Sequence, residues 1–286
     1  MSKGNRVVID DFDEIFDVCS GGIENISLEE LHEFKNHPFR VADDEAMAEL
    51  VESIKQNGVL VPIQVRKRAE GGYEILSGHR RCHAAKLAGC TEICAIVGDY
   101  DDDQATVIMV DANIQRENIL ISEKAKAYRM KYDAMKHQGS SGGSSLQEIS
   151  EQSGEGYKTI QRLIKVADLK PELLDLMDTK KLGLRQGIDL SSLTKEEQKD
   201  VYEVITELGV SLSMDDSARI KEAGKKGYLG KDYLRDILTH DKPKVRKVVF
   251  NQKRLDNYFD PNMSNDDIEK LIVKLLDEWK QKGGQR

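Results

Sequence analysis

The sequence predicts an α+β protein with a small mixed α/β domain, an all-helical domain and a short β-α unit. Alternating apolar residues typical of strands occur between Ile26 and Val97, whereas residues 122–240 show helical spacing. A strand pattern followed by an amphipathic helix returns near the end of the chain. These observations divide the sequence into a flexible acidic arm (1–24), the mixed domain (25–121), the helical domain (122–240) and a C-terminal strand-helix unit (241–286).

The composition narrows the class of protein. The 286 residues exceed one average domain, and 39% hydrophobic with 33% charged residues suits several small cores under a polar surface. No run of about 18 apolar residues occurs, which argues against a membrane protein and for a cytoplasmic one. A formal net charge of −8 argues against coating nucleic acid with the whole surface but allows local binding. The four cysteines lack a paired Cys-x-x-Cys, so we expect buried thiols and no metal site.

The stretch from Gly58 to Gly89 organises the first domain. Apolar residues alternate from Val61 to Val65, Gly71-Gly72 makes a turn, and 73–76 form a second strand, which together predict a β-hairpin. A helix rich in small residues follows the Ser77–Arg81 turn. The first turn of a helix leaves backbone N–H groups unpaired, so a phosphate can approach them over Gly78. A solvated arginine pair beside an ordinary turn explains the same residues equally well.

Helices are expected on both sides of this stretch. Asp43 or Asp44 caps a helix that Gly58 ends, and Asp103 or Gln104 opens another. Ser122 is expected to cap a long helix. The polar segment 111–118 between two helical patterns needs partners: Gln115 and Arg116 either reach a ligand held at the Gly78 turn or cross-link helices.

A helix-turn-helix is predicted between Leu146 and Lys165, behind a Gly/Ser loop at His137–Ser145. Small Ser150 and Gly154 allow two helices to cross closely at a tight turn. The first helix carries acids and the second carries bases, so the second is the one expected to lie along DNA, although generic helical hairpins share this spacing. The expected DNA contacts are Lys158, Thr159, Gln161, Arg162 and Lys165.

The residues after the predicted helix-turn-helix are expected to form several short helices followed by a basic strand. Helices are expected at 171–177, 195–208 and 213–222. Six positive charges without an acid lie between residues 242 and 254, and three of them, Lys244, Arg246 and Lys247, are further candidate DNA contacts. The final helix, about 266–280, carries a broad apolar stripe that indicates dimerisation more than docking on the main body. At the other end, Phe12, Ile15 and Phe16 suit a short acidic amphipathic helix.

These pieces, taken in order, resemble the ParB partition proteins. The resemblance rests on Gly58–Arg66, Gly78–Gly89 and Asn113–Asn118, with a helix-turn-helix downstream. Each motif is weak alone and the set is specific. The form Ser77–Arg81 together with Asp111–Asn118 is similar to the branch carried by plasmids and conjugative elements. The implied N-terminal fold is the ParB/sulfiredoxin-like domain.

The resemblance implies a function. Such proteins bind a palindromic centromere-like DNA site as homodimers, bind CTP with Mg²⁺, close into a clamp, and are moved by a ParA-type ATPase, here through the arm at 12–18. The location implied is the nucleoid or a plasmid. The implied nucleotide-site residues are Gly58, Val61, Pro62, Arg66, Gly78, His79, Arg80, Arg81, Asn113, Gln115 and Arg116.

Two positions depart from the family pattern. His79 and Ala112 stand where Glu is common, and neither side chain offers the hard oxygen ligands that Mg²⁺ prefers. We therefore expect nucleotide binding with slow or absent hydrolysis. The alternatives are a helix-turn-helix transcriptional regulator without a partition role, or a phosphotransfer enzyme or nuclease on the same fold. Sulfiredoxin itself needs a Cys where Gly78 stands.

Overall fold

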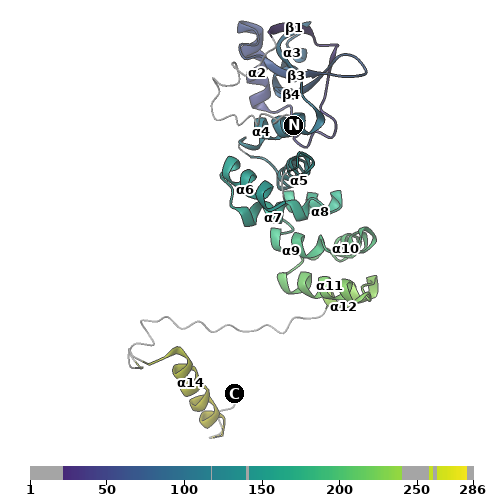
Figure 1. Ribbon diagram of the computed structural model, residues 1–286. Helices are drawn as coiled ribbons and strands as arrows, with labels where there is room; N and C mark the ends of the chain where they lie inside the picture. The colour runs from purple at the N-terminus through teal and green to yellow at the C-terminus, as the bar shows by residue number, and fades with distance from the viewer. Residues whose placement is uncertain (1–21, 117, 140–141, 240–257, 260–262, 282–286) are drawn as a thin grey trace. The chain divides into compact units, whose positions relative to one another are not determined.

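The computed structural model describes residues 22–116, 118–139, 142–239, 258–259 and 263–281 (Figure 1). The chain separates into two compact units, residues 1–239 and 240–286. The first unit contains the sheet and eleven of the described helices, α2 to α12. The two candidate sites that precede residue 240, the Gly78 turn and the predicted helix-turn-helix, therefore belong to one unit.

A five-stranded mixed sheet forms the N-terminal part. Its strands are β1 (Ile23–Ser27), β2 (Leu31–His32), β3 (Ile63–Lys67), β4 (Tyr73–Ser77) and β5 (Glu92–Gly98), in the order β1-β5-β3-β4-β2. The predicted hairpin is confirmed, because β3 and β4 pair antiparallel with Gln64 opposite Ser77 and Lys67 opposite Tyr73. Ile63, Val65 and Ala95 are fully buried in the centre of this sheet. The strand begins at Ile63 rather than Val61, because the carbonyls of Val61 and Pro62 face a side chain instead of a neighbouring strand.

Three helices accompany the sheet: α2 (Glu45–Asn57), α3 (His79–Leu87) and α4 (Asp102–Ile114). Asp44 caps α2 and Gly58 ends it with φ 73°, as predicted. The cap of α4 is Asp101, not Asp103 or Gln104. Its carboxylate accepts a hydrogen bond from the Gln104 backbone N–H at 2.8 Å, and the Gln104 side chain accepts one from the Asp101 N–H in return.

Helix α5 (Ile121–His137) packs along α4 and begins the helical part, as Figure 1 shows. The prediction that Ser122 caps it was wrong. The N-cap is Leu120, and Ser122 lies inside the first turn, where its backbone N–H and its hydroxyl donate to the Asp178 carboxylate at 2.9 and 2.5 Å. A serine near a helix start thus serves a tertiary contact here.

The remaining helices of the first unit are α6 (Gly142–Ser153), α7 (Tyr157–Val166), α8 (Pro171–Asp178), α9 (Leu184–Leu190), α10 (Lys195–Leu208), α11 (Met214–Lys226) and α12 (Lys231–Thr239). Helix α6 begins inside the predicted Gly/Ser loop. Helices α9 and α12 were not predicted. Helix α9 contains Gly187, a weak helix former, but added bulk there would meet the Met177 sulfur at 2.8 Å, so packing requires the small residue.

One hydrophobic cluster joins the sheet domain to the helices. It runs from Phe34 and Leu76 through Met109 and Tyr128 to Ile237. Among the residues with assigned structure, no helix is long and apolar enough to cross a membrane. Helix α4 packs against β4 of the sheet and against α5, so it connects the sheet to the helices that follow.

The second unit contributes α14 (Asn265–Gln281). The helix confirms the predicted element at 266–280. Leu271, Val273, Leu275 and Trp279 are 40 to 60% exposed. The basic strand, with Lys244, Arg246 and Lys247, and the acidic arm lie outside the described residues.

Candidate functional site

The turn before α3 has the backbone geometry of an anion site. Gly78 has φ 98°, a left-handed conformation that favours glycine. A Cβ at this position would lie 2.6 Å from Ile63 Cγ2, so β3 leaves room only for a hydrogen. The first backbone bond of α3 runs from the Cys82 N–H to the Gly78 carbonyl at 2.9 Å, which leaves the preceding amides of the helix start without a helical acceptor. An anion can satisfy these amides.

The Arg81 side chain connects the start of α3 to the segment before β3 by hydrogen bonds. Its Nη1 donates to the carbonyl oxygens of Val61 at 2.5 Å and Pro62 at 2.6 Å. Burial lowers the pKa of the guanidinium. The structure therefore brings Val61, Pro62, Gly78 and Arg81 together, and Arg81 holds the wall of the site with at least one of its donor nitrogens.

Two further guanidinium groups meet at this helix start. Arg80 Nη2 lies 3.3 Å from Asp44 Oδ1, and Arg116 Nη1 donates to Asn113 Oδ1 at 3.3 Å. Asn113 is buried and fixed by donating to the Met109 carbonyl at 2.8 Å. Burial, then the nearby Arg80 cation, lowers the pKa of Arg116. Arg80 and Arg116 repel each other, and a ligand with several negative charges would relieve this repulsion.

His79 is the first residue of α3 and its ring is buried. The side chain is 8% exposed, and neither ring nitrogen has a hydrogen-bond partner among the described residues. It stacks on His37 with ring centroids 3.8 Å apart and planes tilted by 31°. Burial, with smaller contributions from His37 and Arg116, lowers the pKa of His79 to about 3. Sequence reasoning missed His37, whose only signal was its position in an Asn-His-Pro turn.

The remaining predicted residues lie differently. Arg66 is held by Glu74, with Nε and Nη2 donating at 2.7 and 2.6 Å, and by Asp102, with Nη1 at 2.7 Å. Gly58 ends α2, and Gln115 is exposed at the end of α4. Ion pairs thus occupy Arg66. Gly58 has no side chain to contribute, and among the described residues the Gln115 side chain makes no hydrogen bond to the Gly78 turn.

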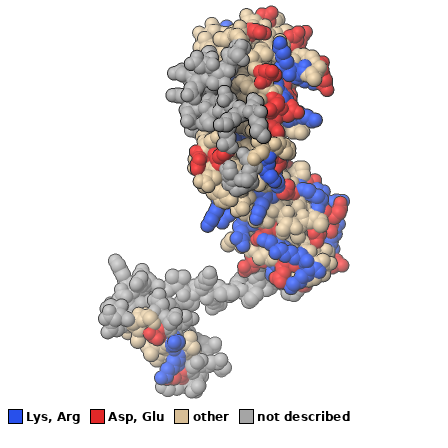
Figure 2. Space-filling view, in the orientation of Figure 1, with Lys and Arg blue, Asp and Glu red and all other residues tan. Residues whose placement is uncertain are grey.

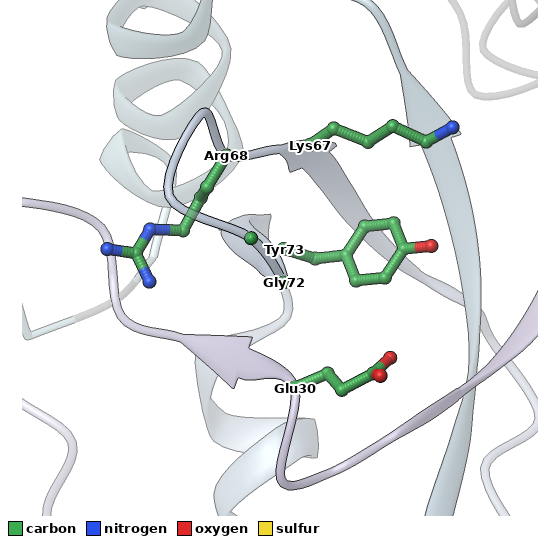
Figure 3. Close-up of a pocket in the computed structure, with 6 residues that line it drawn as sticks. Glu30, Lys67, Arg68, Gly72 and Tyr73 are labelled. Atoms are coloured by element: carbon green, nitrogen blue, oxygen red, sulfur yellow. The ribbon is translucent and has the colours of Figure 1, made fainter.

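A separate hollow of about 280 Å³ lies at the turn of the β3-β4 hairpin (Figure 3). Glu30, Lys67, Arg68 and Tyr73 line it together with the two turn glycines. The strand register puts Lys67 and Tyr73 at one end of the hairpin, while Gln64 and Ser77 form the other end, next to Gly78. This hollow is therefore distinct from the helix start.

The predicted helix-turn-helix falls on α6 and α7. Gly154 has φ 70° and its N–H donates to the Ser150 carbonyl at 3.0 Å, while Ser150 Oγ donates to the Glu155 carbonyl at 2.6 Å. Lys124 on α5 forms an ion pair with Glu155. These bonds fix the turn, as the small residues predicted.

Helix α7 turns one face inward and one outward. Ile160, Leu163 and Ile164 are buried, Thr159 is partly buried, and Lys158, Gln161, Arg162 and Lys165 are exposed. The helix has no acid. The same holds for α3, whereas basic and acidic side chains are interspersed on the face that Figure 2 shows, so both helices are locally basic in an acidic chain.

The fold thus joins a mixed α/β domain, in which α3 starts with unbonded amides beside arginines, to a helical part in which α7 carries an exposed basic face. Residues 15–114 match the ParB N-terminal domain. The probable chromosome 1-partitioning protein ParB of Deinococcus radiodurans is 25% identical over 203 residues, which cover 71% of this chain and 67% of that protein. Stage 0 sporulation protein J of Bacillus subtilis is 38% identical over 128 residues, or 45% of each chain. The chain is therefore similar to ParB partitioning proteins over most of its length.

A C-terminally truncated chromosome-partitioning protein ParB from Caulobacter crescentus, complexed with CTP-gamma-S, is 23% identical and covers 65% of this chain and 99% of that one, with a TM-score of 0.32. Across four curated partitioning relatives, the chain spans 59 to 70% of their length. The likeness to ParB proteins therefore rests on the sequence matches.

Proposed function

We propose that this chain is a DNA partition protein that binds a palindromic DNA site as a homodimer and responds to CTP. The observation that carries the proposal is one compact unit holding both an anion site at the start of α3 and an outward-facing basic helix α7. Neither an isolated repressor nor a phosphotransfer enzyme needs both. The plasmid or conjugative-element branch and the partner ParA-type ATPase, contacted through the acidic arm, are part of the same proposal.

Helix α7 is the DNA-reading helix in this proposal. Its inward face packs through Ile160 and Leu163, which fixes the helix rigidly and leaves Lys158, Gln161 and Arg162 free to reach a groove. Lysine and arginine contacts to phosphates position the protein, and the arginine and glutamine side chains suit base edges. The basic strand with Lys244, Arg246 and Lys247 would add phosphate contacts.

The start of α3 is the nucleotide site in this proposal. The unbonded amides after Gly78, with Arg80 and Arg116, fit a triphosphate, and the segment that Arg81 holds at Val61 and Pro62 would face the base. The described residues contain no group of three or more His, Cys, Asp or Glu side chains suited to a metal ion. Mg²⁺ would therefore be held chiefly by the phosphates, and we propose binding with slow or absent hydrolysis.

The apolar stripe of α14 is the proposed dimer contact. Leu271, Leu275 and Trp279 remain 40 to 60% exposed on a helix of seventeen residues. Two such stripes can cover each other. A symmetric dimer places two copies of α7 on two halves of a palindrome.

Chromatin pull-down with sequencing tests the proposal in a cell that contains the element. Enrichment that spreads over kilobases around one site supports a partition clamp. A sharp promoter peak would indicate a repressor, and no enrichment would indicate an enzyme. Calorimetry of the purified full chain with CTP checks the nucleotide claim, using Arg80→Ala with Arg116→Ala as the impaired variant and Arg68→Ala, at the far end of the hairpin, as the matched control.

A further inference from the structure

The stacked pair His37 and His79 has no role in the function proposed above. Three ring nitrogens, Nδ1 and Nε2 of His79 and Nε2 of His37, are buried without a hydrogen-bond partner among the described residues. A buried polar atom that lacks a hydrogen-bond partner destabilises the fold, so a ligand that supplied a partner would be favoured here. It lies at the first residue of α3, where the backbone amides also lack acceptors.

Charged side chains of both signs surround the pair, with the cation Arg116 beside both rings. His79 faces His37 and Arg116, and His37 faces Glu33, Glu123 and Arg116. Arg116 in turn faces Arg80. Asp44 and Glu123 already have partners, since Asp44 contacts Arg80 and Glu123 accepts a bond from the Arg40 N–H at 2.9 Å. Burial therefore holds both imidazoles neutral, and Arg116 adds to this effect while Glu33 and Glu123 oppose it at His37.

A polyanion reverses this balance. Phosphate oxygens accept hydrogen bonds and carry negative charge, and both effects favour the imidazolium form, which donates from both ring nitrogens. We infer that an anionic nucleotide tail at the start of α3 draws one proton from solvent onto the His37–His79 pair, so that nucleotide binding is coupled to proton uptake. The inference rests on the proposed nucleotide site and adds its regulation by pH.

The sign of the effect follows from linkage. If the complex holds one more proton than its separated parts, CTP affinity falls as pH rises, by up to about tenfold per pH unit for one linked proton. The terminal phosphate of the nucleotide itself titrates near pH 6, which opposes or masks part of this slope. The comparison between variants is therefore decisive.

The experiment is calorimetry of the full chain with CTP at pH 6.5 and pH 7.5, in pairs of buffers with different ionisation enthalpies. The wild type is expected to take up between about half a proton and one proton per CTP at pH 6.5, a change within the range of one linked group. His79→Gln and His37→Gln are expected to reduce the uptake. His83→Gln is the matched control, because His83 lies on the same helix, partly exposed and paired with Asp43 at 2.7 Å.

The outcomes separate the two claims. CTP binding without proton uptake in the wild type, or equal uptake in wild type and both histidine variants, overturns the inference and leaves the proposed function standing. No CTP binding at any pH overturns both. If the variants fail to fold or bind, the His79 imidazole resonance of the wild type decides: a shift to the imidazolium value on adding CTP supports the inference, and an unshifted neutral ring overturns it.

Discussion

A buried lysine joins α4, which packs on the sheet, to α6 of the predicted helix-turn-helix, and removing its acidic partner tests the strength of that contact. Lys131 of α5 is 2% exposed. Its Nζ pairs with the Asp111 carboxylate on α4 and donates to Gln152 Oε1 on α6 at 2.6 Å. Asp111→Ala would leave the ammonium with one neutral partner.

The magnitude follows from this geometry. Breaking one side of a fully buried ion pair costs about 3–5 kcal/mol. The Asp111 side chain is 43% exposed, so water softens the loss and we expect about 2 kcal/mol, roughly a thirtyfold change in the ratio of folded to unfolded protein. Lys131→Met removes the buried charge itself and keeps its apolar stem, so it should cost under about 1 kcal/mol.

Urea unfolding of the full chain measures both variants. Lys126→Met is the control, because Lys126 is exposed on the same helix, and a change within about 0.5 kcal/mol is expected there. The reasoning fails if Asp111→Ala costs no more than Lys131→Met, since an uncompensated buried ammonium is the whole basis of the difference.

Three further predictions concern the sites. Gly78→Ala should destabilise the chain by about 2 kcal/mol or more through its left-handed φ and the 2.6 Å approach to Ile63, whereas Gly89→Ala, with φ 81° and open space, should cost only about 1–2 kcal/mol in the same urea experiment. Equal costs would show that β3 does not restrict Gly78. Because the pKa of His79 is about 3 when folded and 6.5 when unfolded, the ligand-free chain binds fewer protons than the unfolded chain, and its stability should fall as pH drops below 6.5, by about 2 kcal/mol at pH 5. Thermal melts of His79→Gln should show a weaker fall, and an unchanged pH profile would contradict the burial argument. Lys158→Ala should weaken DNA binding and should reduce, by about one, the slope of the logarithm of the binding constant against the logarithm of the salt concentration. Lys199→Ala changes a lysine exposed on α10 and should leave both quantities unchanged. Fluorescence anisotropy with DNA at several salt concentrations measures both.

The strand-to-helix turn was predictable because its signal is local. Gly78 between an alternating strand and a small-residue helix specifies its own conformation, and the structure has it at φ 98°. The α6-α7 pair was predictable for the same reason, since the small Ser150 and the Gly154 with positive φ suit two helices that meet at a tight turn.

Other features depended on contacts between distant residues. Ser122 matches a cap in sequence, but its partner Asp178 is 56 residues away. Arg81 looked like a free phosphate donor, yet it bonds to carbonyls nineteen and twenty residues earlier. His37 meets His79 only because the chain before α2 folds over the start of α3. No local pattern specifies any of these.

The central claim is that an anion at the start of α3 controls how the chain holds DNA. The most direct measurement is the amount of full-length protein retained on its operator DNA, with both DNA ends blocked, in the presence and absence of CTP. We predict that CTP changes retention for the wild type and for Arg68→Ala, and that Arg80→Ala with Arg116→Ala abolishes the change. Retention that responds to CTP equally in all three proteins would contradict the claim.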